Sequence, residues 1–218
     1  MATLNSFYPY IIPHVNGCPE ITVDTSLKSA IIEFCERTLI IQRDHDPVSI
    51  VKDIADYDFE TPLSGHLIIK IMNAWHQGTP LNPISPDDVH DPTIYNKFAL
   101  EDNTTLTGMP RNIFQKDERT FTLLPIPDKT TSLSLTMRVA LKPTRATTTV
   151  EDVLYEDYAE IIADGTLSTL MMSPNKKYSN TQMAGFHAMR FQQGINKVKQ
   201  LSTKGYVRSS VKINIPRI

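Results

Sequence analysis

The sequence predicts an α+β protein in which a first helix and a C-terminal helix pair flank a β-rich segment. Residues 27–38 repeat apolar side chains every three or four positions, and residues 149–203 return to that spacing, whereas residues 132–141 alternate apolar with polar. With 218 residues and 40% hydrophobic content, the chain can bury a sizeable core. We expect the first helix and the C-terminal antiparallel hairpin to form a small helical bundle, with a β-rich domain inserted between them.

Four segments are expected along the chain. They are an N-terminal arm with the first helix of the bundle at 1–43, a β-rich domain at 44–142, a C-terminal helix hairpin at 143–204 and an extended docking tail at 205–218. The arm contains three prolines, which remove backbone donors and should keep a helix from running through residues 1–25. Its apolar stretch FYPYIIPHV is expected to be buried, either in the chain's own core or in a groove of a neighbour.

The first helix has its N-cap candidates at Asp24, Thr25 and Ser26 and is expected to end near Asp46-Pro47, because proline disfavours helix at the residue before it. Its apolar stripe consists of Leu27, Ala30, Ile31, Phe34, Cys35 and Thr38. Cys35 is therefore expected to be a small core residue and not a metal ligand or half of a disulfide.

The β-rich segment shows two clear strand patterns and one hairpin. HLIIKIMNAW is rich in isoleucine, and RNIFQKDERTFTLLPIP is expected to form two strands around a turn at 116–119. SLSLTMRVAL predicts a half-buried antiparallel strand. The side chains expected on its apolar face are Leu133, Leu135, Met137, Val139 and Leu141.

The C-terminal hairpin is predicted from two apolar stripes joined by the turn SPNKKYSN. Thr149 is an N-cap candidate for its first helix, with Glu151 and Asp152 favourably placed in the first turn. Gly165 lies inside this helix, where it would either allow another helix to approach closely or cause a kink. The second helix, near 181–203, should bury one face made by Ala184, Ala188, Phe191, Ile195 and Val198.

Charge is distributed very unevenly along the chain. Net charge is −2, yet there is no Asp or Glu from Gly165 to the end, while the preceding part holds 13 basic residues against 24 acidic ones. The acid-free segment is expected either to meet an acidic partner, which could be another subunit, a different protein or nucleic acid, or to be a solvated basic face. Its nine basic residues are Lys176, Lys177, Arg190, Lys197, Lys199, Lys204, Arg208, Lys212 and Arg217.

The final segment, YVRSSVKINIPRI, has the composition of a β-strand and follows a helix stop at Lys204-Gly205. It could pair with the central sheet or add a strand to a partner. We expect it to form an interface with another protein or subunit through Tyr206, Val207, Arg208, Val211, Lys212, Ile213, Ile215, Arg217 and Ile218.

Nothing in the sequence indicates catalysis, so we expect no enzyme, no catalytic residue, no metal site and no cofactor. There is no phosphate-binding glycine loop, no nucleophile elbow and no paired-cysteine or HExxH motif. Asp87, Asp88, His90 and Asp91 resemble a helix start more than a metal site, and the pair His45 and Asp46 is equally weak. His187 is expected to be a packing residue. The N-terminus lacks the features of a signal peptide, and no apolar run is long enough to cross a membrane, so a cytoplasm-like compartment is expected.

Two stretches resemble one protein family. Residues 8–38, with GCPE followed by a helix ending in EFCERT, and residues 124–199, with a P-x-P turn, a KPT exit, a glycine in an acidic helix and RFQQGI, resemble podovirus-type phage head-to-tail adaptor (connector) proteins. The resemblance implies a structural virion protein of the neck or tail, assembled in the host cytoplasm. It implies a dodecameric ring that docks under the portal protein through the C-terminal tail and receives the tail nozzle protein.

In such a ring, double-stranded DNA would pass through the lumen without being read, and Lys176, Lys177, Arg190, Lys197 and Lys199 would touch the DNA or an acidic partner. Gly165 and Phe191 would serve helix packing. Three alternatives remain open from the residues: a tail nozzle or tail-completion component, a small DNA-binding packaging accessory, and a hydrolase whose site has no recognisable motif. No membrane partner is expected.

Overall fold

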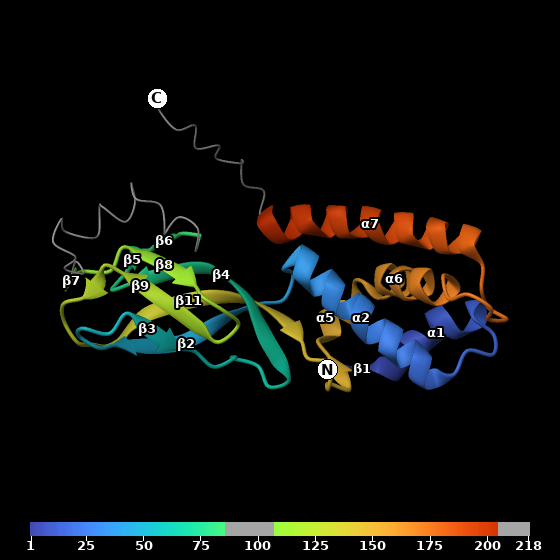
Figure 1. Ribbon diagram of the computed structural model, residues 1–218, viewed down its shortest axis with the longest axis horizontal. Coiled ribbons are helices and arrows are strands. Elements are labelled where there is room, and N and C mark those ends of the chain that lie inside the picture. The colour runs from blue at the N-terminus through green and yellow to red at the C-terminus, as the bar shows by residue number, and fades with distance from the viewer. Residues whose placement is uncertain (86–106, 205–218) are drawn as a thin grey trace, which may run out of the picture. The chain divides into compact units, whose positions relative to one another are not determined.

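The computed structural model describes residues 1–85 and 107–204, with side chains to Ser202, and divides the chain into two compact units (Figure 1). The helical unit comprises Met1–Ile40 and the chain from Pro143 onward, and the β unit comprises Ile41–Lys142. The protein therefore mixes helix and sheet, as the α+β prediction stated. The tail from 205 and the Asp87–Asp91 cluster lie outside the described residues.

The helical unit is built from three longer helices and several short elements. They are β1 (Ala2–Thr3), a 3₁₀ turn η1 (Leu4–Phe7), α1 (Tyr8–Ile11), a second turn η2 (Ile12–His14), α2 (Glu20–Thr38), β12 (Thr149–Val150), α5 (Asp152–Glu156), α6 (Ala159–Met171) and α7 (Thr181–Lys204). Strands β1 and β12 pair antiparallel, so the start of the chain is tied to the entry of the hairpin. Helix α6 packs against both α2 and α7.

The N-terminal arm is helical in short turns and α2 begins at Glu20, so the expectation that prolines keep helix out of residues 1–25 is wrong. Pro9 and Pro13 each occupy the first turn of a short helix, where a missing N–H costs nothing. Phe7, Ile11 and Val15 are buried. The apolar arm thus belongs to the core of its own chain.

Helix α2 differs from the prediction at both ends. It begins at Glu20, after Pro19 in the N-cap position, and it ends at Thr38, because Leu39 adopts a left-handed conformation with φ 52°. The residues up to Asp46-Pro47 that were expected to continue the helix form a strand instead. The expected stripe from Leu27 to Thr38 is buried, and burial raises the pKa of the Cys35 thiol.

The expected continuous helix over 150–172 is interrupted. Thr149 lies in β12 and caps nothing, and α5 and α6 are separated at Asp157-Tyr158. Tyr158 is buried with its ring centroid 5.3 Å from that of Phe34 on α2, and its φ of −130° is not helical. Packing of this ring on α2 accompanies the break.

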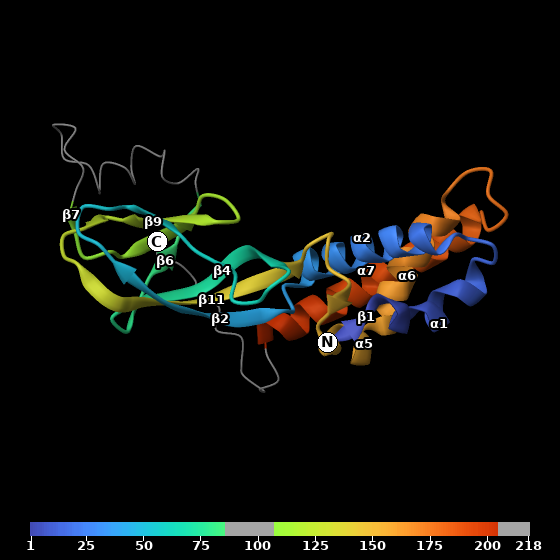
Figure 2. The same cartoon turned by 90° about the horizontal axis from the view of Figure 1, so that it is seen from below.

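The β unit contains two four-stranded sheets, ordered β2-β11-β4-β5 and β3-β9-β8-β6, which Figure 2 shows as two layers. Their bounds are β2 (Gln42–Ile50), β3 (Asp56–Asp58), β4 (His66–His76), β5 (Thr79–Pro80), β6 (Asn82–Pro83), β8 (Asn112–Gln115), β9 (Thr120–Leu124) and β11 (Thr131–Pro143). A parallel pair, β7 (Thr107–Gly108) with β10 (Ile126–Pro127), completes the unit. Buried side chains include Ile50, Phe59, Ile68, Ile113, Phe121, Leu123, Leu135 and Val139.

The alternation predicted for 132–141 holds except at its first member. Leu135, Met137, Val139 and Leu141 are buried, but Leu133 is 66% exposed and has a φ of 46°. The pairing of β11 with β2 shifts register between Thr131 and Met137, which turns Leu133 off the buried face.

Candidate interaction surfaces

The α6–α7 hairpin brings two glycines against large side chains of the opposite helix. A Cβ added to Gly165 of α6 would lie 2.9 Å from ring atoms of Phe191, and one added to Gly194 of α7 would lie 2.6 Å from Cγ2 of Ile161. Both positions therefore permit close approach of the helices. Gly165 and Phe191 were singled out from the sequence. Gly194, inside RFQQGI, was missed, and its signal was a glycine in the middle of an otherwise strong helical pattern.

A buried polar cluster joins the same two helices. The carboxylate of Asp164 on α6 accepts a hydrogen bond from Nδ1 of His187 at 2.7 Å and forms an ion pair with Nε of Arg190 at 3.2 Å, both on α7. The side chains of Asp164 and His187 are 7% and 6% exposed, whereas that of Arg190 is 46% exposed. Because a buried charge is tolerated only when it is paired, the cluster fixes the register of α7 on α6.

Helix α7 is capped at its start and is anchored to α2 by two side-chain hydrogen bonds. Asn180 caps its first turn, with Oδ1 accepting from the backbone N–H of Met183 at 3.1 Å. Gln192 pairs with Arg37 of α2, and the Ser202 hydroxyl donates to the backbone carbonyl of Thr38 at 2.6 Å. The last contact supplies a partner for a carbonyl at the C-terminal end of α2.

The anchored α7 turns a second face outward. Its buried side chains are Ala184, His187, Phe191, Ile195 and Val198, so the predicted inward position of Ala188 is wrong and His187 lies on the buried face instead. On the other side, the exposed α7 face carries Met183, Phe186, Met189, Arg190, Lys197 and Leu201. The guanidinium of Arg190 lies over the Phe186 ring, 5.8 Å from its centroid.

The basic residues predicted to meet an acidic partner are separated. Lys176 and Lys177 lie exposed in the turn between α6 and α7, and Lys197 and Lys199 lie on α7. Arg190 is bound to Asp164. The nine tail residues predicted to form an interface with another protein or subunit, Tyr206, Val207, Arg208, Val211, Lys212, Ile213, Ile215, Arg217 and Ile218, lie outside the described residues.

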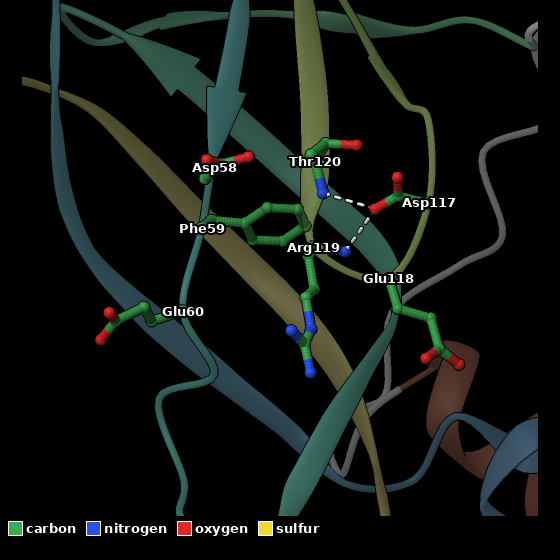
Figure 3. Close-up of a pocket in the computed structure, with 7 residues that line it drawn as sticks. All are labelled: Asp58, Phe59, Glu60, Asp117, Glu118, Arg119 and Thr120. Carbon is green, nitrogen blue, oxygen red and sulfur yellow. Dashed lines mark hydrogen bonds between the residues drawn. The ribbon is translucent and has the colours of Figure 1, made fainter.

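An acidic groove lies in the β unit at the turn that joins β8 to β9. Figure 3 shows its lining residues, which are Asp58, Phe59, Glu60, Asp117, Glu118, Arg119 and Thr120. Asp117 folds back on the turn, and backbone N–H groups of Arg119 and Thr120 donate to its Oδ1 at 2.7 and 2.8 Å, which lowers the pKa of its carboxyl. Glu118 is bound to Lys142 at 2.8 Å.

Two acids of the groove have structural partners: Asp117 holds the turn, and Glu118 is bound to Lys142 of the neighbouring strand β11. His45 of β2 has one ring nitrogen 2.6 Å from the Asp46 carbonyl oxygen and the other 2.8 Å from that of Glu60. Across residues 1–85 and 107–202, no group of three or more potential metal ligands comes together.

A family model described as SU10 adaptor protein matches residues 15–212, so the chain belongs to the SU10 adaptor protein family. This match confirms the resemblance to phage head-to-tail adaptors, and the family is one of structural adaptor proteins. A search of curated proteins found no match. Among the described helices, none has the length and apolar character needed to span a membrane.

Proposed function

We propose that this chain forms a ring in the neck of a phage virion, between the portal protein and the tail nozzle protein, through which double-stranded DNA leaves the head. Membership of the adaptor family over residues 15–212 is the observation that carries the proposal. The resemblance implies about a dozen copies, and such rings are closed by contacts between different surfaces of identical subunits.

The segment proposed to dock on the portal is the tail, residues 206–218. Its alternation of β-forming and basic residues suits addition of a strand to an exposed sheet edge or insertion into a groove. The family match extends to residue 212, so it includes the first part of this tail. Lys176, Lys177, Lys197 and Lys199 are proposed to line the channel or to meet acidic protein.

Native mass spectrometry of the purified chain, alone and mixed with the portal protein of the same genome, tests this proposal. We expect a species of low copy number that converts to a portal-bound ring. A chain lacking 206–218 should keep the circular dichroism and melting temperature of the full chain but fail to bind the portal. A full chain that ignores the portal would contradict the proposal.

A DNA-binding packaging accessory is the second candidate, favoured by the exposed lysines of the α6–α7 turn and of α7. This function requires DNA retention by the isolated chain that falls steeply with salt, because counterions are released on binding. Lys176→Glu with Lys177→Glu should then lower the affinity and the salt slope. We expect instead only weak retention, lost near physiological salt. A tail nozzle or tail-completion component would bind an assembled neck but not the portal alone.

A further inference from the structure

We propose that neighbouring copies in the ring contact each other through two different surfaces. The exposed α7 face of one copy lies on an acidic face of the next copy. The acidic face consists of Asp152 and Glu156 on α5, Asp157 between α5 and α6, and Glu160 in the first turn of α6. This inference rests on the proposed ring and names the two surfaces that build it, with a second copy of this chain as the occupant of each.

The exposed α7 face has the composition of a protein contact. Met183, Phe186 and Met189 are 38%, 46% and 52% exposed, and their spacing of three places them in one stripe along the helix. Aromatic residues, methionine and arginine are enriched at protein interfaces. These apolar side chains would gain no favourable contact on a solvated basic face or on a surface that binds DNA phosphates.

One cation of the exposed α7 face, Arg190, is held in position. The guanidinium of Arg190 is fixed by its ion pair with Asp164 and by its contact with the Phe186 ring. Its exposed part is therefore already oriented before a partner binds. Lys197 lies two turns further along the same face. An oriented guanidinium and a second cation beside an apolar stripe suit a partner that presents carboxylates.

The acidic face supplies such carboxylates within nine consecutive residues, Asp152–Glu160. All four acidic side chains are exposed. The N-terminal ammonium group reaches Asp152 at 2.6 Å, which leaves the other three acids with a surplus of negative charge on this part of the surface. The neighbouring half-buried Tyr155 and Val153 offer apolar area beside them.

The helices that carry these two faces, α7 and α5, lie on opposite sides of α6 within the helical unit. Figure 1 shows α7 along one side, with α6 beneath it, and α5 on the other. Different and complementary surfaces on opposite sides of one subunit are what a heterologous ring requires, whereas a two-fold dimer would use one surface twice. From Gly165 onward the sequence contains no Asp or Glu, so α7 itself contributes no acidic side chain.

Two substitutions at one position separate the effect of the sign of a new charge from the effect of losing an apolar side chain. Met189→Glu and Met189→Lys both place a long charged side chain on the exposed α7 face and have similar helix propensity. Ring assembly on the portal, measured by native mass spectrometry with the full chain, should fall at least tenfold for Met189→Glu and far less for Met189→Lys. Ile21→Asp, at an exposed apolar position of α2 outside both faces, is the matched control.

Charge exchange tests the partner surface. Glu156→Lys with Glu160→Lys should also abolish rings, and adding Met189→Glu to that chain should restore them in part, because the new carboxylate on the α7 face can then pair with the new lysines. Glu20→Lys, at an exposed position of α2, controls for a general change of charge. A variant is included in the comparison only if its melting temperature equals that of the unaltered chain.

The outcomes separate the two proposals. If the unaltered chain forms no ring, the proposed function fails. If it forms rings and Met189→Glu and Met189→Lys reduce them equally, or neither reduces them, this inference is wrong. Rings that form normally from the variants but no longer bind the portal would show that the α7 face docks the portal instead, which also overturns it.

Discussion

At the scale of single residues, the α6–α7 hairpin depends on the two glycine contacts and the buried Asp164 cluster. Gly165 and Gly194 have no side chain where Phe191 and Ile161 need room, and each contact uses the flat or branched side chain of the facing helix. Since core packing tolerates little extra volume, these positions should respond to one added methyl group.

We predict that Gly165→Ala and Gly194→Ala each destabilise the chain by about 1–3 kcal/mol, because the new Cβ must displace a packed side chain. Gly165→Leu should cost more than Gly165→Ala. The control is Gly185→Ala on α7, the helix that also holds Gly194. A Cβ at Gly185 would meet nothing within 4 Å, and helix propensity predicts a gain in stability of about 0.5–1 kcal/mol. Urea unfolding measures the differences. Equal effects at Gly165 and Gly185 would contradict the packing geometry.

A double-mutant cycle tests the buried cluster. Alanine at Asp164 and at His187, singly and together, should give a coupling energy of about 1–3 kcal/mol, because each residue leaves the other unpartnered in the interior. The exposed Glu33–Arg37 pair on α2, at 2.8 Å, is the matched control and should couple by only about 0.3–0.5 kcal/mol. Additive effects at Asp164 and His187 would show that their contact contributes nothing to stability.

At the scale of elements, strand pairing and helix packing overrode local sequence patterns. Residues 39–41 continue the apolar pattern of α2, yet the chain leaves the helix through the left-handed Leu39, and Gln42–Ile50 pair as β2 with β11. Pro47 fits this strand because β2 is at the edge of its sheet and the register shifts there. The final register of β11 then decides which of its alternating residues are buried.

Leu133 illustrates the consequence for β11. We predict that Leu133→Gly leaves stability unchanged or raises it by about 1 kcal/mol, because the left-handed conformation is strained for leucine and its side chain is exposed. Leu135→Ala, two residues further and fully buried, should cost about 2–5 kcal/mol. Thermal unfolding of both variants measures the contrast. A large loss of stability in Leu133→Gly would contradict this prediction, because it would show that the Leu133 side chain makes stabilising contacts.

At the scale of the whole molecule, the β unit is an insertion into the helical unit. The chain enters it at Ile41 and leaves it at Lys142, and these two ends are adjacent because the backbone N–H of Leu141 donates to the carbonyl of Ile41 at 2.9 Å. Insertions with adjacent ends can leave the host unit's core intact.

We therefore predict that a chain in which a short Gly-Ser linker replaces residues 41–142 still folds its helices. Circular dichroism should retain the helical signal, and urea should unfold it in one cooperative transition. A comparable chain that also carries Gly194→Ala should unfold at lower urea, which shows that the native helix packing is retained. Loss of cooperative unfolding in the excised chain would mean that the β unit is required for the helical core.

The sequence by itself determined the α+β class, the stripe of α2 from Leu27 to Thr38, the strand pattern of β4, the hairpin turn at 116–119 and the asymmetry of charge. These depend on local periodicity and composition, which a single segment displays without its neighbours. It also carried the resemblance to phage head-to-tail adaptors, which the family match confirms.

Only the tertiary structure decided where α2 ends, why α5 and α6 separate, that Leu133 faces outward, and that His187 is buried against Asp164. It also brought Met183, Phe186 and Met189 onto an exposed face while α5 lies on the other side of α6. The physical reason is that each of these outcomes depends on a partner distant in sequence: Tyr158 needs Phe34, and β2 needs β11. Local propensities are worth tenths of a kcal/mol, and packing against such partners is worth several.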